Sequence, residues 1–131
     1  MKVLALDVGD KRTGLAVGVT ESKLALPFGL VEAEVFEDWA EQVKKVVVDE
    51  QIDLVLVGDP KTLSGGSSSQ TKKSQDWGNR LQTLINVKVE FFDERLTSKQ
   101  ADGVLDKSTR SRDEIAAMYL LQDYLNSRNL A

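Results

Sequence analysis

The first part of the chain alternates apolar runs with short polar turns. Residues 2–9 and 12–19 are mostly aliphatic, and two polar residues separate them. Two such runs joined by a short polar turn are typical of a β-hairpin. A third apolar stretch over residues 27–34 would complete an antiparallel meander.

Helical periodicity begins near residue 35. Apolar side chains then recur at every third or fourth position and predict an amphipathic helix that ends near Glu50, with Phe36, Trp39, Ala40, Val43 and Val47 on its apolar face. Residues 52–57 follow as an uninterrupted apolar strand. A strand, a helix and a second strand that is apolar throughout predict a parallel pair.

Six further segments complete the predicted order. They are a Gly- and Ser-rich loop over 59–70, a helix over 71–85, a strand over 87–92, a short helix from Thr97 or Ser98, a polar loop over 106–111, and a helix over 112–127. The order predicts one α/β domain spanning residues 1–131. Its mixed five-stranded sheet would hold three antiparallel and two parallel strands, with helices on both faces. We expect Trp39 and Trp77 to lie in the core rather than to stack on bases.

A single carboxylate interrupts the first apolar run. Asp7 lies in a segment, residues 3–9, that is otherwise typical of a strand buried on both faces. An unpaired buried charge is costly, so Asp7 must be paired, be protonated or bind a metal. Lys11 and Arg12 follow between two glycines, a composition that suits phosphate. A structural ion pair between Asp7 and one of these cations is the competing interpretation.

The composition narrows the chemistry that Asp7 can serve. The chain contains no cysteine and no histidine, which excludes disulfides, Cys or His zinc sites, thiol nucleophiles and His-based triads. Catalysis would have to use carboxylates, Lys or Arg, hydroxyls or a hard metal ion. No apolar run approaches the roughly 20 residues of a membrane span, and Asp7 and Asp10 interrupt any secretory leader. We therefore expect a cytoplasmic protein.

Charge is distributed unevenly along the chain. The net charge of −4 does not indicate a non-specific nucleic-acid binder. Residues 1–57 carry 6 basic and 11 acidic side chains, whereas residues 58–131 carry 11 basic and 10 acidic ones. A local basic surface on an acidic protein is therefore compatible with the sequence.

Two further carboxylates stand at the ends of predicted elements. Glu94 follows the fifth strand, and Asp113 opens the last helix. If that helix packs across the sheet, both converge on Asp7 and form an oxygen site suited to Mg²⁺ or Mn²⁺. Such a site can activate water for attack on a phosphodiester. Taken singly, Glu94 is better explained as a solvated residue and Asp113 by the helix dipole.

Four segments together resemble one protein family. They are Asp7 to Gly14, which matches D-x-G-x-K-R-x-G; Val57-Gly58-x-Pro60; Asp93 to Ser98, which matches D-E-R-L-T-S; and the closing helix with Asp113-x-x-Ala116-Ala117 and Leu121 to Leu125. This order is similar to that of the YqgF family, also called RuvX, of pre-16S rRNA nucleases and Holliday-junction-resolvase-like proteins. The resemblance covers nearly the whole chain and implies an RNase H-like fold.

The resemblance also implies functional residues and a substrate. The carboxylates implied to be catalytic and to bind Mg²⁺ or Mn²⁺ are Asp7, Glu94 and Asp113. The residues implied to lie near the substrate backbone are Lys11, Arg12 and Arg95. The implied function is that of a metal-dependent hydrolase, a nuclease that trims the 5′ end of the 16S rRNA precursor during ribosome biogenesis.

The chain departs from the family pattern at several positions. Asp59 and Lys61 stand where the family usually or often has leucine. The lysine-rich stretch near the final Asp is replaced by three other cations, Lys107, Arg110 and Arg112, which keep the charge. The fourth carboxylate of related resolvases has only a weak counterpart, Asp93.

Three other functions fit parts of the same pattern. The acidic net charge and the missing fourth carboxylate favour a module that binds nucleic acid in ribosome assembly or transcription without cleaving it. A Holliday-junction resolvase acting on branched DNA is another alternative. An actin-like or sugar-kinase ATPase also begins with D-x-G, but 131 residues supply only one of the two lobes that enclose ATP. In the nuclease and binding interpretations the partner is nucleic acid, and no membrane is involved.

Overall fold

The computed structural model describes residues 1–59, 69–93 and 112–127. The predictions for most of the Gly- and Ser-rich loop, for a helix from Thr97 or Ser98 and for the loop over 106–111 lie outside this part of the chain. Glu94 and Arg95 lie outside it as well. Among the described residues, no helix is long and apolar enough to cross a membrane.

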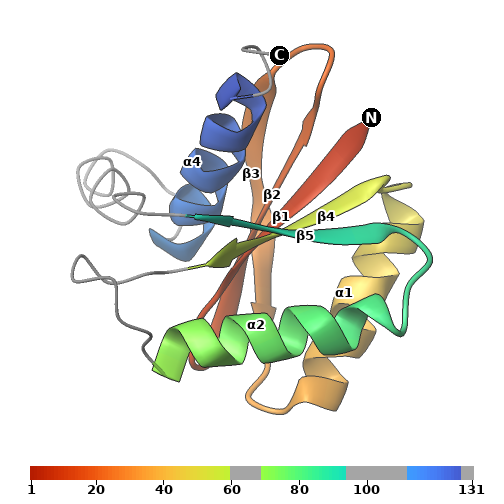
Figure 1. The fold of residues 1–131 in the computed structure, drawn as a ribbon, viewed down its shortest axis with the longest axis vertical. Helices are drawn as coiled ribbons and strands as arrows, with labels where there is room; N and C mark the ends of the chain where they lie inside the picture. The colour runs from red at the N-terminus through yellow and green to blue at the C-terminus, as the bar shows by residue number, and fades with distance from the viewer. Residues whose placement is uncertain (60–68, 94–111, 128–131) are drawn as a thin grey trace.

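Five strands form one mixed sheet in the order β3-β2-β1-β4-β5 (Figure 1). Their bounds are β1 Lys2–Val8, β2 Arg12–Val19, β3 Leu24–Glu32, β4 Leu54–Asp59 and β5 Lys88–Asp93. β2 pairs antiparallel with both β1 and β3, whereas β4 runs parallel to both β1 and β5. The predicted mixed sheet is therefore confirmed.

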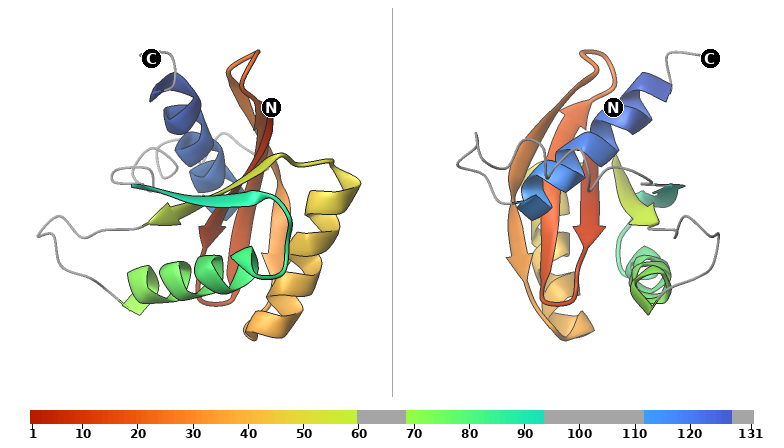
Figure 2. Two further views of the ribbon diagram at one scale, coloured as in Figure 1. Left: turned by 45° about the vertical axis from the view of Figure 1, so that its right-hand side comes forward. Right: turned by 90° about the vertical axis from the view of Figure 1, so that its left-hand side faces the viewer.

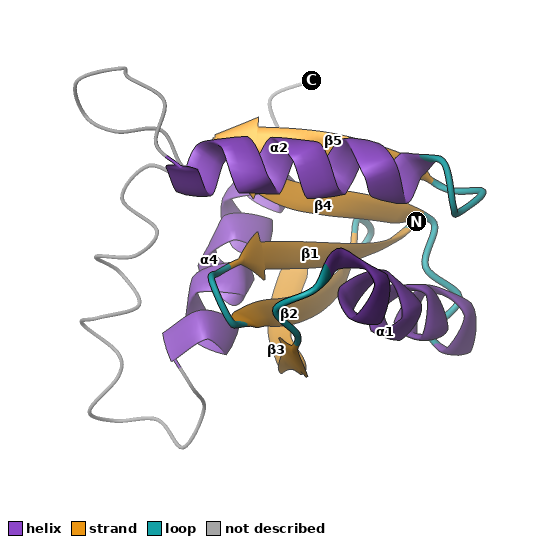
Figure 3. Cartoon of the chain, turned by 90° about the horizontal axis from the view of Figure 1, so that it is seen from below, coloured by secondary structure: helices purple, strands orange, loops and turns teal. Residues whose placement is uncertain are grey.

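Helices cover both faces of the sheet, as predicted. α1 (Phe36–Asp49) and α2 (Ser69–Gln82) pack on one face, and α4 (Arg112–Ser127) packs on the other (Figure 2). Figure 3 shows α2 running along β4 and β5, with α4 crossing β1 and β2. Elements from the two ends of the chain, β1 and α4, are thereby brought into contact.

Several element boundaries differ from the prediction by a few residues, and the starts of two strands differ for local reasons. β4 begins at Leu54 rather than at Ile52, because Gln51 has a positive φ of 54° and the amide of Ile52 still donates to a carbonyl of α1. β3 begins at Leu24, so that Pro27 lies within it. β3 is an edge strand, where a residue without an amide hydrogen is tolerated.

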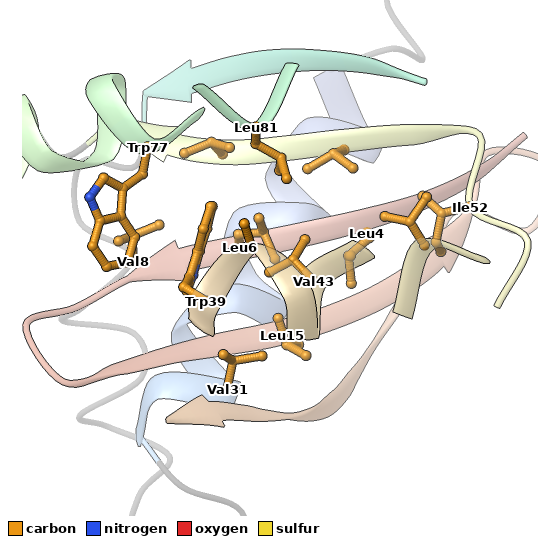
Figure 4. Close-up of a cluster of buried hydrophobic side chains, with 14 of the residues drawn as sticks. Leu4, Leu6, Val8, Leu15, Val31, Trp39, Val43, Ile52, Trp77 and Leu81 are labelled. Atoms are coloured by element: carbon orange, nitrogen blue, oxygen red, sulfur yellow. The ribbon is translucent and has the colours of Figure 1, made fainter. Parts of the chain in front are cut away.

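The core between the sheet and the helices α1 and α2 is built around two tryptophans (Figure 4). Trp39 of α1 and Trp77 of α2 have ring centroids 5.0 Å apart and pack against aliphatic side chains of β1. Both are buried, as predicted. The Trp39 Nε1 donates a hydrogen bond of 2.9 Å to Oγ1 of Thr13, which is also buried.

Replacing Thr13 with valine should remove this bond while keeping the shape of the side chain. The indole N–H of Trp39 would then be buried without its acceptor, which costs about 1–3 kcal/mol. Equilibrium unfolding in urea measures the loss. As a control, Thr83→Val removes an exposed hydroxyl that donates to the Arg80 carbonyl, and it should cost less than about 0.5 kcal/mol because water can replace that bond. Equal losses in the two variants would contradict this account.

The second core lies between the sheet and α4. Val3 and Ala5 of β1 pack there against aliphatic side chains of α4. The ring of Tyr124 meets Phe92 edge-on at 5.6 Å, and its hydroxyl donates to Oε2 of Glu90 at 3.0 Å. These contacts with β1 and β5 fix α4 across the sheet.

Candidate active site

The carboxyl ends of the three parallel strands β1, β4 and β5 lie at the same end of the sheet. Asp7 is the last residue but one of β1, Asp59 is the last of β4, and Asp93 is the last of β5. The register of β4 and β5 sets Asp59 beside Asp93. Glu94 follows Asp93 directly in the chain. In α/β proteins, ligands bind at the carboxyl ends of parallel strands, which makes this end of the sheet the candidate site.

Side-chain alternation places Asp7 on the α4 face of the sheet. In β1, Val3 and Ala5 belong to the core under α4, whereas Leu4 and Leu6 belong to the core under α1 and α2. Asp7 therefore projects on the same side as Val3 and Ala5. Because it lies near the carboxyl end of β1, Asp7 is half-buried, which corrects the expectation of a fully buried carboxylate.

The first turn of α4 touches the sheet directly opposite Asp7. Gly14 of β2 pairs with Asp7 across the antiparallel ladder. A Cβ at Gly14 would lie 1.9 Å from the carbonyl oxygen of Asp113 and 2.9 Å from the amide nitrogen of Glu114. Only glycine allows the helix backbone to approach the strand this closely. The contact places the backbone of Asp113 against Gly14, the residue that pairs with Asp7, although Asp113 and Asp7 are far apart in the sequence.

Two exposed cations flank these carboxylates. Arg12 Nε lies 3.6 Å from Asp113 Oδ2, and the two side chains are 58% and 25% exposed. Lys11 precedes Arg12 and is also exposed. A hollow of about 280 Å³ opens here, lined by Gly9, Asp10, Lys11, Arg12 and Asp113. An exposed ion pair is weak in water, so Arg12 can exchange the carboxylate for a phosphate at little cost.

Backbone hydrogen bonds fix the turn between β1 and β2. The amide of Gly9 donates to the carbonyl of Arg12 at 2.9 Å, and the amide of Ala33 donates to the carbonyl of Lys11 at 3.0 Å. A Cβ at Gly9 would lie 2.6 Å from the Arg12 carbonyl oxygen. The two glycines that flank the cations thus have separate roles, since Gly9 closes the turn and Gly14 admits α4.

Among the described residues, no third acidic side chain is grouped with Asp7 and Asp113. Within residues 1–59, 69–93 and 112–127, no three acidic side chains form a group that could hold a metal ion. Glu94, like Arg95, lies outside these residues. Asp59 is buried on the opposite face, where Gln75 Nε2 lies 3.4 Å from each of its carboxylate oxygens.

Sequence reasoning missed one contact of this site. Lys73 of α2 reaches the β1–β2 turn with its Nζ, 2.7 Å from the carbonyl oxygen of Gly9. In the sequence Lys73 is one of several basic residues near the motifs, next to Lys72. Only its place on the sheet-facing side of α2, one turn before Trp77, offers a signal.

Comparison with known proteins agrees with the motif analysis. A family model described as "RuvX: Holliday junction resolvase" matches residues 1–127. Proteins from Chloroflexus aggregans and Caldanaerobacter subterraneus, each named "Putative pre-16S rRNA nuclease", are similar to this chain. The first is 35% identical over 96% of this chain and 94% of its own length. The second is 34% identical and covers 98% of both chains.

Solved structures share the fold. RuvC of T. thermophilus, in complex with a Holliday junction substrate, is similar with a TM-score of 0.68 at 18% identity, over 98% of this chain and 96% of the RuvC chain. Fowlpox virus resolvase, in complex with Holliday junction DNA, gives a TM-score of 0.64 at 18% identity, over 98% and 99% of the two chains. The likeness to RuvC confirms the predicted RNase H-like fold.

Proposed function

The chain belongs to the RuvX family, and on this basis we propose that it is a metal-dependent nuclease that processes the 5′ end of pre-16S rRNA in the cytoplasm. The names of its relatives support the substrate. One structural observation carries the proposal: the backbone of Asp113 touches Gly14, and Gly14 pairs with Asp7 at the carboxyl ends of the parallel strands. Half-buried carboxylates that lie close together repel one another, and a bound cation would relieve that repulsion.

The donor set fits a hard divalent cation. Asp7 and Asp113 offer only oxygen ligands, and the chain has no histidine or cysteine that would favour zinc. We assign Mg²⁺ or Mn²⁺ to these two side chains and to Glu94, which follows the last residue of β5. The chemistry supplied by such a cation is activation of water and neutralisation of the charge on the leaving oxygen.

The protein's own cations bind and orient the substrate in this proposal. Lys11 and Arg12 project beside the carboxylates, where they bind phosphates of the nucleic acid. Arginine presents a fork that suits a phosphate, and lysine a point charge. When Arg12 moves to a phosphate, it leaves the carboxylate of Asp113 available to a cation. Arg95, next to Glu94 in the chain, is assigned to the same nucleic-acid backbone.

Metal removal tests the proposal. The purified protein and an RNA that spans the 5′ end of the 16S precursor should give a shortened product in Mg²⁺ or Mn²⁺, none in EDTA, and the product again when metal is restored. Circular dichroism in EDTA controls for unfolding, and we expect no change because two hydrophobic cores hold the sheet and helices. Equal cleavage in EDTA would contradict the metal dependence. RNA binding that survives EDTA, with no product in either metal, would support the non-cleaving module instead.

One observation favours a second candidate function. The family model that matches this chain is described as a Holliday junction resolvase. In that case the protein should cut a four-way DNA junction faster than the rRNA precursor. Initial rates on both substrates, at equal substrate and Mg²⁺ concentrations, decide between the two functions.

A further inference from the structure

Lys73 joins α2 to the turn between β1 and β2. Its Nζ donates hydrogen bonds to the carbonyl oxygens of Gly9 at 2.7 Å and Asp10 at 2.9 Å. The same ammonium lies 4.3 Å from the ring centroid of Trp77. Two carbonyl oxygens and an aromatic face therefore hold this cation, and Trp77 is itself fixed in the core.

The turn is anchored along its whole length. Lys73 binds the carbonyls of Gly9 and Asp10, the amide of Ala33 binds the carbonyl of Lys11, and the amide of Gly9 binds the carbonyl of Arg12. Each carbonyl from Gly9 to Arg12 thus has a donor. Lys73 supplies its two bonds from a side chain of another element, so a single substitution removes them without altering the sequence of the turn.

We propose that Lys73 is a positioning residue for the nuclease reaction. By binding two carbonyls of the turn, it keeps Lys11 and Arg12 beside the carboxylates of the site. The inference rests on the proposed function, because the position of the turn matters to cleavage only if these cations bind the substrate there. The Lys73 ammonium has three donors and already uses two on carbonyls, so it acts through the turn rather than on a phosphate.

Removal of the ammonium tests this role. Lys73→Met keeps the aliphatic stem, and we expect kcat/KM for cleavage to fall about tenfold, in the range found when a group that orients a functional residue is lost. Lys73→Arg keeps a cation and should restore most of the rate. Lys72→Met removes the same charge from the exposed neighbouring position and should leave the rate unchanged.

A double-mutant cycle separates positioning from direct contact with the substrate. In a Lys11→Ala, Arg12→Ala background, Lys73→Met should lower kcat/KM by no more than about twofold, because residues that act through one another are not additive. A full tenfold loss in that background would overturn the positioning role and indicate a direct phosphate contact.

Amide hydrogen exchange provides a readout that does not depend on activity. Lys73→Met should speed exchange at the amides of Gly9 and Ala33, which close the turn, whereas Lys72→Met should not. Unchanged exchange at both amides in Lys73→Met would overturn the inference. If the parent protein cleaves no substrate, the proposed function fails, but this measurement still decides whether Lys73 holds the turn. Lys73→Gln keeps a neutral amide donor but removes the charge, and it serves as the second variant if the methionine variant does not fold.

Discussion

The Asp7→Asn protein is expected to cleave RNA at least about 10²-fold more slowly than the parent, the loss typical of removing one preorganised electrostatic contact at a reaction centre. Asparagine has the shape of aspartate but no charge, and a neutral amide is a poorer ligand for a hard divalent cation. β1 is the central strand of the sheet, so Asp7 lies between β4 and the contact of α4 with β2. Single-turnover rates at saturating Mg²⁺ measure the effect.

Folding should survive this substitution. Asp7 is half-buried at the carboxyl end of β1, and asparagine keeps the shape of its side chain, so the free energy of unfolding should change by less than about 1 kcal/mol. Asp53→Asn is the matched control, because Asp53 Oδ2 accepts the amide of Lys2 at 2.8 Å, at the opposite end of β1. That variant should cleave at the parental rate. Parental cleavage by Asp7→Asn would refute the catalytic assignment.

Gly14→Ala should lower both stability and activity. The added Cβ would lie 1.9 Å from the carbonyl oxygen of Asp113 and 2.3 Å from its carbonyl carbon. These are backbone atoms, so no side-chain rotation relieves the clash, and the first turn of α4 must move away from β2. Overpacking of this kind costs about 1–3 kcal/mol. A displacement of about 1 Å in a functional group can cost about 10²-fold in rate.

Gly18→Ala is the control for Gly14→Ala, on the same face of the same strand. Its Cβ would lie 2.6 Å from the carbonyl oxygen of Leu24, and 3.3 Å from side-chain atoms of both Leu121 and Leu125 in the second half of α4. We expect a comparable loss of stability in urea unfolding, with kcat close to that of the parent. The kcat values of the two variants are compared at a temperature below the unfolding transition of each. An equal fall of kcat in the two variants would show that the position of Asp113 does not limit the reaction.

Hydrophobic periodicity predicted most of the fold because each element must bury at least one face. The continuous apolar run at 52–57 predicted a strand covered on both sides, and β4 is buried throughout and parallel to both neighbours. The final helix was predicted over 112–127, as observed. The boundary at Gln51 was missed because it depends on the positive φ of one residue, which leaves no periodic signal.

The candidate site was only partly accessible to sequence reasoning. Asp7, Lys11 and Arg12 belong to one short segment, so their proximity follows from the hairpin. Asp59 also ends a parallel strand, yet alternation turns it towards α2 and away from Asp7. Counting carboxylates at strand ends does not show from which face of the sheet each one projects. That face depends on the register of the strand and on the residue at which the strand begins.

The sequence by itself determined the elements, their order and the available chemistry, which is limited to carboxylates, hydroxyls and cations by the lack of histidine and cysteine. Only the tertiary structure decided which of these groups meet. The first turn of α4 reaches the strand beside Asp7 because Gly14 lets α4 touch β2, and Lys73 reaches the β1–β2 turn because α2 packs beside it. The physical reason is that helical and strand periods are local properties, whereas contacts between distant residues depend on how both cores pack around the whole sheet.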